Sequence, residues 1–326
     1  MTEDGGCGAL TREDVTYGYR LILGRPPESN DVIDHCRGTI ATRQDLIAVL
    51  LKSEEFTTSN PEYFNCLTFA NKLGNRMAVE MHPSAGQLSL LLDCVSKTWT
   101  FLGETRPHWS VLSSERFLPG NIDAQEDVFF DSGKADVKQL IDILDYVGEK
   151  PEHFETVTEF GCGLGRITNH LADTFTSVIA CDISQPHLEL AARKSEEFGK
   201  RNILYSRVTM PEFGMRFSVD LWYSVIVLQH NPPPVMRAIL GRVFSLLRPG
   251  GIAIFQVPTF APHYRFDVTE YLATSLDRSG FDMHVLPLRA IFDVVAENGC
   301  RMIDVLDDLR AGGTWVSNMI VVKKPE

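Results

Sequence analysis

The sequence predicts an α/β fold with a mostly parallel sheet in its C-terminal half, preceded by a helical N-terminal region. A glycine-rich turn at positions 161, 163 and 165 follows the short apolar run 156–160, and a second apolar run, 177–183, comes next. Further apolar runs alternate with helical patterns as far as residue 257. Strands that alternate with helices form a parallel sheet with helices on both faces, and ligands bind at the C-terminal ends of its strands.

Length and composition indicate a globular protein with more than one part. The 326 residues suffice for one domain of roughly 170 to 200 residues and a smaller one. Hydrophobic residues make up 44% of the chain and charged residues 23%, as is ordinary for soluble proteins. The net charge of -12 opposes binding to polyanions, so we expect no nucleic-acid partner.

The cysteines and the apolar runs indicate the compartment. The seven cysteines are an odd number without C-x-x-C pairs, which indicates reduced thiols rather than disulfides or a zinc site, and no metal is expected. The N-terminus lacks the basic and apolar regions of a signal peptide, and no apolar run is long enough to span a membrane. We therefore expect a cytoplasmic protein without a transmembrane segment.

The N-terminal region has helical signals. Residues 1–10 are glycine-rich and expected to be disordered, and residues 11–60 are expected to form a small helical domain. Thr11, followed by acids at 13 and 14, marks a first N-cap, and Gly-Arg-Pro-Pro at 24–27 ends that helix. A second helix begins at Asn30 or Asp31, and Thr42 caps a third.

Two short runs in this region resemble a known type of helical domain. The run 19–26 (Tyr-Arg-Leu-Ile-Leu-Gly-Arg-Pro) and the run 53–56 (Ser-Glu-Glu-Phe) are similar to a small helical domain of unknown function found in bacterial surface and glycan-biosynthesis proteins. The resemblance implies a docking or dimerisation module without chemistry of its own. A protein partner bound through residues 11–60 is therefore expected.

Residues 61–150 are expected to form a helical linker and lid. Helical patterns cover 85–99 and 134–147, and between them lie the runs 102–111 and 129–133. The first contains His108 and Trp109, which are candidate substrate-binding residues of a lid that excludes water from a site. The alternative is a surface loop in which Trp109 only fills a groove.

Residues 151–326 are expected to form the α/β domain. After the glycine turn, expected at 161–165, its helices are expected at 167–175, 186–198, 234–247 and 289–298. Its strands are expected at 156–160, 177–183, 203–208, 220–228, 251–257, 302–306 and 315–322.

The glycine turn predicts a nucleoside cofactor. A Cβ atom at Gly161 or Gly163 would hold a ligand away from the backbone, and the turn requires unusual dihedral angles. Asp182, at the tip of the second strand, can accept hydrogen bonds from both ribose hydroxyls. Glu159 precedes the turn, where its charge would repel a pyrophosphate but suits a ligand that bears an ammonium and a sulfonium group.

The run 159–166 (Glu-Phe-Gly-Cys-Gly-Leu-Gly-Arg) resembles motif I of the class I S-adenosylmethionine-dependent methyltransferases. The resemblance implies a Rossmann-like seven-stranded fold, in which the last strand is antiparallel and inserts beside the fifth, with S-adenosylmethionine as cofactor. The acid that often binds the adenine amine after the third strand in this family is not obvious here, since Val-Thr-Met occupies 208–210. The cofactor contacts we expect are Glu159, Gly161, Gly163, Gly165, Asp182, Ile183, Ser184 and Ser224.

A candidate base follows the fourth strand. The run 222–234 looks like the motif IV region of the same family and contains His230 just before a proline turn. A neutral imidazole is available at cellular pH, so His230 is the candidate catalytic base, and the alternative is a histidine that braces the loop. His263 and Tyr264 are weaker catalytic candidates.

The long insertion 259–286 is the expected substrate cap, because loops of this length inside a compact domain are usually functional. Its aromatic and polar side chains suit a sugar ring and its hydroxyls. The substrate-binding candidates are His108 and Trp109 from the lid and Tyr264, Arg265 and His284 from the cap.

The sequence therefore predicts an S-adenosylmethionine-dependent O-methyltransferase that acts on a sugar or a glycan precursor. The sugar part depends on the N-terminal resemblance, on the cap and lid composition, and on the runs 222–234 and 247–251, which look like those of bacterial polysaccharide-cluster methyltransferases. Three alternatives stay open: a methyltransferase for a non-sugar small molecule, a non-catalytic scaffold in a glycan-assembly complex, and an NAD(P)-dependent oxidoreductase. The glycine spacing and Glu159 disfavour the oxidoreductase.

Overall fold

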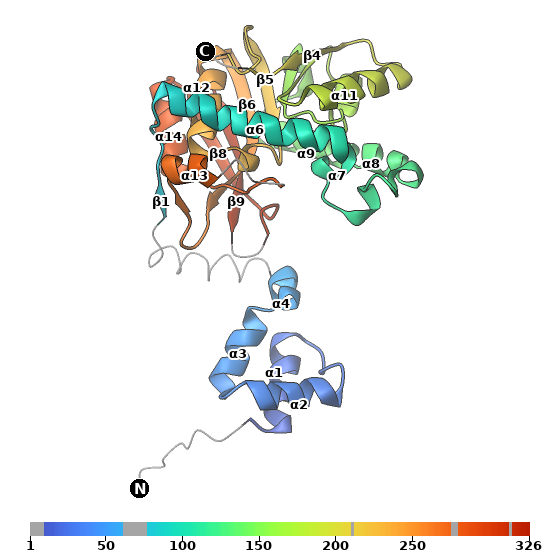
Figure 1. The fold of residues 1–326 in the computed structure, drawn as a ribbon, viewed down its shortest axis with the longest axis vertical. Coiled ribbons are helices and arrows are strands. Elements are labelled where there is room, and N and C mark those ends of the chain that lie inside the picture. The colour runs from blue at the N-terminus through green and yellow to red at the C-terminus, as the bar shows by residue number, and fades with distance from the viewer. Residues whose placement is uncertain (1–9, 61–76, 210–211, 275–279, 313–314) are drawn as a thin grey trace. The chain divides into compact units, whose positions relative to one another are not determined.

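The chain divides into two compact units, Met1–Asn75 and Arg76–Glu326 (Figure 1). The computed structural model describes residues 10–60, 77–209, 212–274, 280–312 and 315–326. The expected disorder of residues 1–10 falls, except for Leu10, outside the described residues, and so does the stretch 61–76 of the expected linker. Leu10 itself is buried against the first helices, so the expectation is wrong at that position.

The first unit is a small group of helices around one core. Its helices are α1 (Arg12–Ile22), α2 (Asn30–Thr39), α3 (Arg43–Leu51) and α4 (Glu54–Ser59). Thr11 and Thr42 close capping boxes at α1 and α3, as the sequence predicted, and Ser29 caps α2. The buried core consists of Leu10, Val15, Ile33, Cys36, Leu46 and Leu50.

One surface of the first unit is apolar. A groove of about 440 Å³ lies between α1 and α3. Beside it, Tyr17 is 65% exposed, Leu21 is 87% exposed and Ile47 is 46% exposed. Large apolar side chains that gather on a surface are typical of interaction sites.

The second unit is built on a seven-stranded sheet of order β4-β3-β2-β5-β6-β9-β8. The first five strands in this order are parallel, and β9 is antiparallel to both of its neighbours. The predicted fold class is therefore confirmed, including the last strand inserted beside the fifth. The strands are β2 (Thr156–Phe160), β3 (Ser177–Asp182), β4 (Ile203–Arg207), β5 (Val219–Ser224), β6 (Leu247–Phe260), β8 (Arg301–Asp308) and β9 (Val316–Lys323).

Helices cover both faces of this sheet (Figure 1). On one face lie α9 (Gly133–Tyr146), α10 (Thr168–Thr174) and α11 (Gln185–Glu197), and Leu140 packs there with Tyr223. On the other face lie α12 (Pro233–Leu246) and α14 (Leu288–Glu297), and Phe244 packs there with Trp222. Alternate residues of β5 thus serve two separate cores, as a strand with helices on both faces requires.

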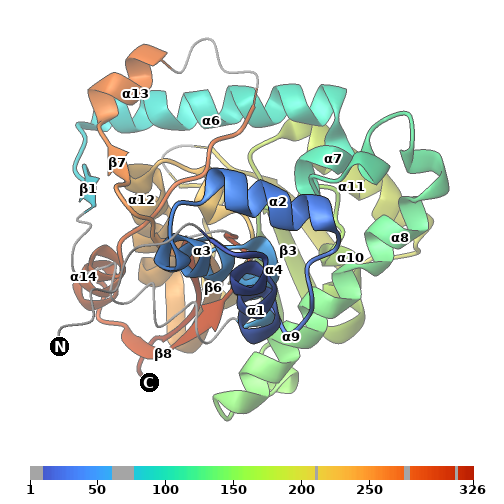
Figure 2. The ribbon, with the colours of Figure 1, turned by 90° about the horizontal axis from the view of Figure 1, so that it is seen from below.

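The long helix α6 (Ala85–Thr105) connects the two faces. It contacts α12 at one end and α11 at the other, and it runs between α13 (Val268–Thr274) and α7 (Pro107–Val111) (Figure 2). Its residues Leu92, Val95 and Trp99 face the C-terminal ends of the central strands. The helix therefore roofs the edge of the sheet at which ligands bind in parallel α/β folds.

Several element boundaries differ from the predicted ones. The predicted helix 85–99 continues to Thr105, so the first part of the run 102–111, expected in the lid, is helical, and the rest is α7 with Pro107 as its first residue. Phe129 and Phe130, from the run 129–133 between the two predicted helices, belong to α8 (Glu126–Asp131). The strand β6 is longer than predicted, because its antiparallel partner β9 pairs with it as far as Phe260.

The insertion 259–286 is partly regular structure. After β6 it contributes β7 (Arg265–Phe266), which pairs in parallel with β1 (Ala78–Val79), and then α13. Residues 275–279 of the insertion lie outside the described residues. Among the helices that are described, none is long and apolar enough to cross a membrane.

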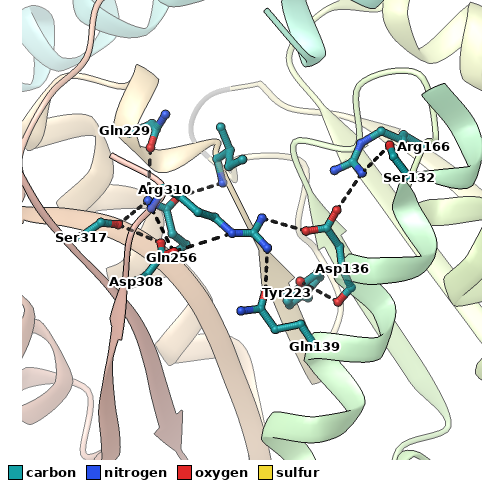
Figure 3. Close-up of polar contacts among 11 residues, drawn as sticks. Ser132, Asp136, Gln139, Arg166, Tyr223, Gln229, Gln256, Asp308, Arg310 and Ser317 are labelled. Carbon is teal, nitrogen blue, oxygen red and sulfur yellow. Dashed lines mark hydrogen bonds and ion pairs between the residues drawn. The ribbon is translucent and has the colours of Figure 1, made fainter. Parts of the chain in front are cut away.

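A buried group of ions joins three parts of the second unit (Figure 3). Asp136 of α9 pairs through one oxygen with Arg166, which ends the glycine turn, and through the other with Arg310, which follows β8, each at 2.7 Å. Arg310 also donates to Gln139 of α9 at 2.6 Å. Because Asp136 and Arg166 are nearly inaccessible to water, each of these charges depends on protein partners for its compensation.

Replacing Asp136 should therefore lower the stability of the fold strongly. We expect Asp136→Ala to lower the free energy of unfolding by about 3–5 kcal/mol, since it leaves the guanidinium of Arg166 buried without its partner. Lys138→Ala, on the same helix, removes an exposed pair with Asp142 and should cost less than about 0.5 kcal/mol. Chemical denaturation measures both, and equal losses would contradict the assignment.

Candidate active site

A cavity of about 430 Å³ opens at the C-terminal ends of the central strands. Its floor is the glycine turn after β2, the tip of β3 and the loop after β5. Its cover comes from α6, from α7 and from the residues around Phe281 and Met283. A volume of this size is in the range of small-molecule sites.

The three glycines of the turn leave little side-chain volume on the floor of the cavity, where Cys162 also lies. Gly161, Gly163 and Gly165 all have positive φ angles, of 78°, 54° and 78°. A Cβ atom on Gly161 would lie 2.3 Å from a Val227 methyl, and one on Gly163 would lie 2.8 Å from a Val111 methyl. The backbone of the turn is therefore packed closely against the loop after β5 and against α7, as expected where a backbone must approach a ligand.

Asp182 holds the two neighbouring loops together. One carboxylate oxygen accepts the N–H of Gly163 at 2.8 Å, and the other accepts the N–H of Ser184 at 2.9 Å. Each oxygen keeps a further lone pair for a ligand. Asp182 lines the cavity with Ile183, so both lie where the sequence placed a cofactor.

Glu159 is a buried carboxyl on the cavity wall. It is 3% exposed, and Thr168 donates to it at 2.5 Å. Burial raises the pKa of Glu159 to about 8, and the nearby Arg166 opposes this shift only in part. At neutral pH the carboxyl is therefore largely protonated in the free protein, and a cation in the cavity would favour its ionised form.

Aromatic side chains form the other end of the cavity. The rings of Trp99 and Phe281 stack with centroids 5.6 Å apart and planes 12° apart, and Trp109 lies 5.8 Å from Phe281. The Arg106 guanidinium covers the outer ring face of Trp109 at 5.1 Å. Of these residues the sequence singled out only Trp109, because Trp99 and Phe281 come together through two segments far apart in the chain.

His230 lies against this aromatic group. Its ring is 4.7 Å from Phe281 and 5.5 Å from Trp99. Its Nδ1 lies 3.0 Å from the carbonyl of Asp282, and its Nε2 lies 3.3 Å from the side-chain nitrogen of Gln229. Burial lowers the pKa of His230 to about 4, so the ring is neutral at physiological pH.

A second histidine, His187, links the cover to the cofactor side. Its Nδ1 lies 2.7 Å from the hydroxyl of Ser184, and its Nε2 lies 2.9 Å from the hydroxyl of Ser110 on α7. Burial lowers the pKa of His187 and keeps the ring neutral. Sequence reasoning missed His187, although a polar side chain on the inner face of α11, one turn after Asp182, was a signal for it.

Not all of the expected cofactor residues reach the cavity. Ser184 is buried against His187, and Ser224 donates to the carbonyl of Phe160 at 3.0 Å, so both side chains act within the walls. Gly165 lies behind the turn, where its carbonyl accepts the side-chain N–H of Asn169. Those that line the cavity are Glu159, Gly161, Gly163, Asp182 and Ile183.

The expected acceptor residues are dispersed. His108 points away from the cavity, edge-on to Phe129, and Tyr264 pairs with His284 at 2.8 Å inside the insertion. His263 and Arg265 are exposed on either side of Tyr264. Of the lid and cap candidates only Trp109 lines the cavity. Arg265 lies in β7, which pairs with β1, and its side chain is exposed.

Within the described part of the chain, no three His, Cys, Asp or Glu side chains gather as metal ligands would. The charged residues that line the cavity are Glu159, Asp182 and Arg166.

The family model for a methyltransferase domain matches residues 157–251. The match begins in β2 and ends in β6, and it includes the glycine turn, Asp182 and the loop after β5. This segment is therefore a methyltransferase domain, within a longer chain.

Curated relatives match a similar stretch. Phosphoethanolamine N-methyltransferase 1 of Triticum aestivum is 33% identical over 103 residues, 30% of this chain and 20% of that protein. Trans-aconitate 2-methyltransferase of Deinococcus radiodurans is 29% identical over 122 residues, 37% of this chain and 44% of that protein. This chain thus spans less than half the length of either relative.

Among solved structures, magnesium protoporphyrin IX methyltransferase from Synechocystis PCC 6803 with bound SAM has a TM-score of 0.45 and 16% identity to this chain. The similarity covers 70% of this chain and 97% of that one.

The close packing of the turn can be tested with two glycines of equal φ. We expect Gly165→Ala to destabilise the protein by about 1–2 kcal/mol, mainly through backbone strain, because the nearest atom to its Cβ, Nδ2 of Asn169 at 3.2 Å, needs only a small shift. Gly161→Ala should cost about 1–3 kcal/mol more, because the Cβ collides with Val227. Equal losses in denaturant unfolding would show that Val227 moves aside freely.

Proposed function

We propose that this chain is an S-adenosylmethionine-dependent methyltransferase whose acceptor is a small molecule. The observation that carries the proposal is one cavity in which two buried carboxyl groups, Glu159 and Asp182, flank a glycine-rich turn. The match of residues 157–251 to a methyltransferase domain supports the same function.

The residues of the floor fit this cofactor. Glu159 would hold the ammonium group, since a buried carboxyl ionises most readily beside a cation. Asp182 would accept the ribose hydroxyls with the lone pairs that Gly163 and Ser184 leave unused. Gly161 and Gly163 give the ligand access to the backbone of the turn.

The chemistry that S-adenosylmethionine supplies when bound is a methyl group on a cationic sulfur: a lone pair of the acceptor bonds to the methyl carbon, the carbon–sulfur bond breaks with its electrons left on sulfur, and the acceptor loses a proton. The protein's part is to align the acceptor and to exclude water. Leu92, Val95 and Trp99 of α6 and Trp109 of α7 cover the cavity for this purpose.

For the acceptor we propose a molecule with a flat, apolar ring. Trp99, Trp109 and Phe281 pack against one another and line the covered end of the cavity, and a wall of aromatic side chains packs well against planar rings. The sugar acceptor predicted from the sequence depended on hydroxyl-binding side chains of the insertion, and Tyr264, Arg265 and His284 do not line the cavity. A sugar that stacks on these rings stays the alternative.

A non-catalytic scaffold is the competing function. It is favoured by the exposed apolar groove on the first unit, where Tyr17, Leu21 and Ile47 could receive a protein partner. The intact glycine turn and Asp182 favour a working enzyme. Docking through the first unit is compatible with either function.

The cofactor can be tested by calorimetry. We expect S-adenosylmethionine to bind and NAD to bind weakly or not at all, and tighter binding of NAD would overturn the proposal. Asp182→Ala should weaken S-adenosylmethionine binding by about 1–3 kcal/mol, or about 5–150-fold in Kd, through lost hydrogen bonds to a charged group. Asp173→Ala, which changes an exposed carboxylate, is the control and should leave Kd unchanged.

The pKa of Glu159 predicts a pH dependence of cofactor binding. Below pH 8 the carboxyl is protonated in the free protein, so a bound ammonium must displace that proton. Affinity should therefore rise between pH 6 and 8, by at most about ten-fold per pH unit, with proton release on binding. Calorimetry in buffers of different ionisation enthalpy measures this release, and in Glu159→Gln that release should disappear.

The acceptor can be tested with labelled cofactor and a panel of phenols, flat heterocycles, nucleotide sugars and lipid-linked glycans. We expect turnover in the first two groups, and Trp99→Ala should raise KM for the acceptor about ten-fold or more while Kd for the cofactor changes little. Turnover confined to sugars would overturn the acceptor class. No turnover with any member would favour the scaffold.

A further inference from the structure

The loop after β5 begins with a strained residue. Ile226 has a φ of 58°, which β-branched residues rarely adopt, and it lines the cavity beside the glycine turn. Its N–H donates to Oε1 of Gln256 at 2.9 Å. Gln256 is fully buried in β6, so a residue of the next strand holds this loop in place.

From Gln256 a line of hydrogen bonds continues to His230. Nε2 of Gln256 donates to Oε1 of Gln229 at 3.2 Å and to the hydroxyl of Ser317 at 2.6 Å (Figure 3). The side-chain nitrogen of Gln229 lies 3.3 Å from Nε2 of His230, and Nδ1 of His230 lies 3.0 Å from the carbonyl of Asp282.

The two ends of this line determine its direction. The N–H of Ile226 can only donate, and the carbonyl of Asp282 can only accept. Every bond between them must therefore run from Ile226 towards Asp282, which assigns both glutamine amides and the His230 tautomer. Ser317 agrees with this assignment, because it accepts from Gln256 and donates its single proton to Asp308 at 3.0 Å.

The direction of these hydrogen bonds disfavours a charged His230. With Nδ1–H donating to Asp282, Nε2 must accept from Gln229. A protonated ring would place a second N–H against the Gln229 N–H, and two donors that face each other repel. Burial of the ring also lowers the pKa of His230, while the charge of Asp282 raises the pKa of His230. The other titratable side chains around the two cavities that His230 lines are Cys94, Tyr271, Glu159, Cys162, Arg166, Asp182 and His187.

We propose that Gln256 and Gln229 are positioning residues that hold His230 uncharged, with its Nε2 as a hydrogen-bond acceptor. They also connect the strained loop at Ile226 to residues 280–283, which cover the end of the cavity where the methyl acceptor would bind. The inference rests on the proposed function in one respect: an uncharged His230 does not repel a sulfonium in the same cavity. In this arrangement His230 braces the loop and the cover, and it does not act as the general base.

The test measures the pKa of His230 by nuclear magnetic resonance, which needs no turnover. In Gln229→Met the N–H donor that faces Nε2 of His230 is removed, and in Gln256→Met the Gln229 amide loses the bond that fixes its orientation and can rotate. In both variants the pKa of His230 should therefore rise by about one unit, the effect of one hydrogen bond. Thr259→Val is the matched control. It removes another buried side-chain bond between β6 and β9, the 2.6 Å bond from Thr259 to Asn318, without touching His230.

An unchanged His230 pKa in both glutamine variants, or an equal rise in Thr259→Val, would overturn the proposal. If Gln256→Met does not fold, Gln229→Met decides alone, because it keeps the bond from Ile226 to Gln256. Turnover gives a second reading: His230→Ala should lower kcat less than about ten-fold, whereas loss of a general base costs about 10²–10⁴-fold. Absence of all turnover in the unmodified protein would refute the proposed function and leave the pKa result standing.

Discussion

The bridge that Asp182 makes between two loops is the constraint on which the site depends. Parallel pairing places Phe160 beside Cys181, so the turn after β2 and the loop after β3 leave the sheet side by side. The carboxylate of Asp182 then accepts one backbone N–H from each loop. Both loops are held open over the same cavity, and the same carboxylate still lines that cavity. A side chain that both builds a site and serves it cannot be exchanged without changing both.

The cover of the cavity comes from outside the segment that matches the methyltransferase domain. α6 and α7 precede β2 in the chain, and the residues around Phe281 follow β6, yet they meet over the strand ends. His187 couples this cover to the floor, because it joins Ser110 of α7 to Ser184 beside Asp182. A ligand that moves the β3 loop would thereby act on α7. These added segments surround the end of the cavity at which we propose that the acceptor binds, and the floor is where we propose that the cofactor binds.

Two buried polar systems support the two ends of the cavity and meet at Asp308 (Figure 3). One is the ion group in which Asp136 joins Arg166 to Arg310, and the other is the line from Ile226 to His230. Asp308 accepts from Ser317 and from the backbone N–H of Arg310, so the hairpin of β8 and β9 touches both systems. Buried polar groups that are hydrogen-bonded or ion-paired favour one arrangement of the chain, although Nε of Arg166 has no hydrogen-bond partner among the described residues. The antiparallel strands thus hold rigid a site to which they contribute no lining residue.

The sequence by itself determined the fold class, most of the strand and helix positions, and the cofactor floor, because those features depend on local patterns. Apolar periodicity sets the elements, and Glu159, Asp182 and the glycines lie within one strand–turn–helix–strand unit. Tertiary structure alone decided the rest. Trp99, Phe281 and His187 come together from elements far apart in the chain, and His263 and Arg265 are exposed beside and within β7, which pairs with β1. The charge of His230 likewise depends on Gln256, a residue of another strand, since a hydrogen-bond direction is a property of the assembled network and not of any one segment.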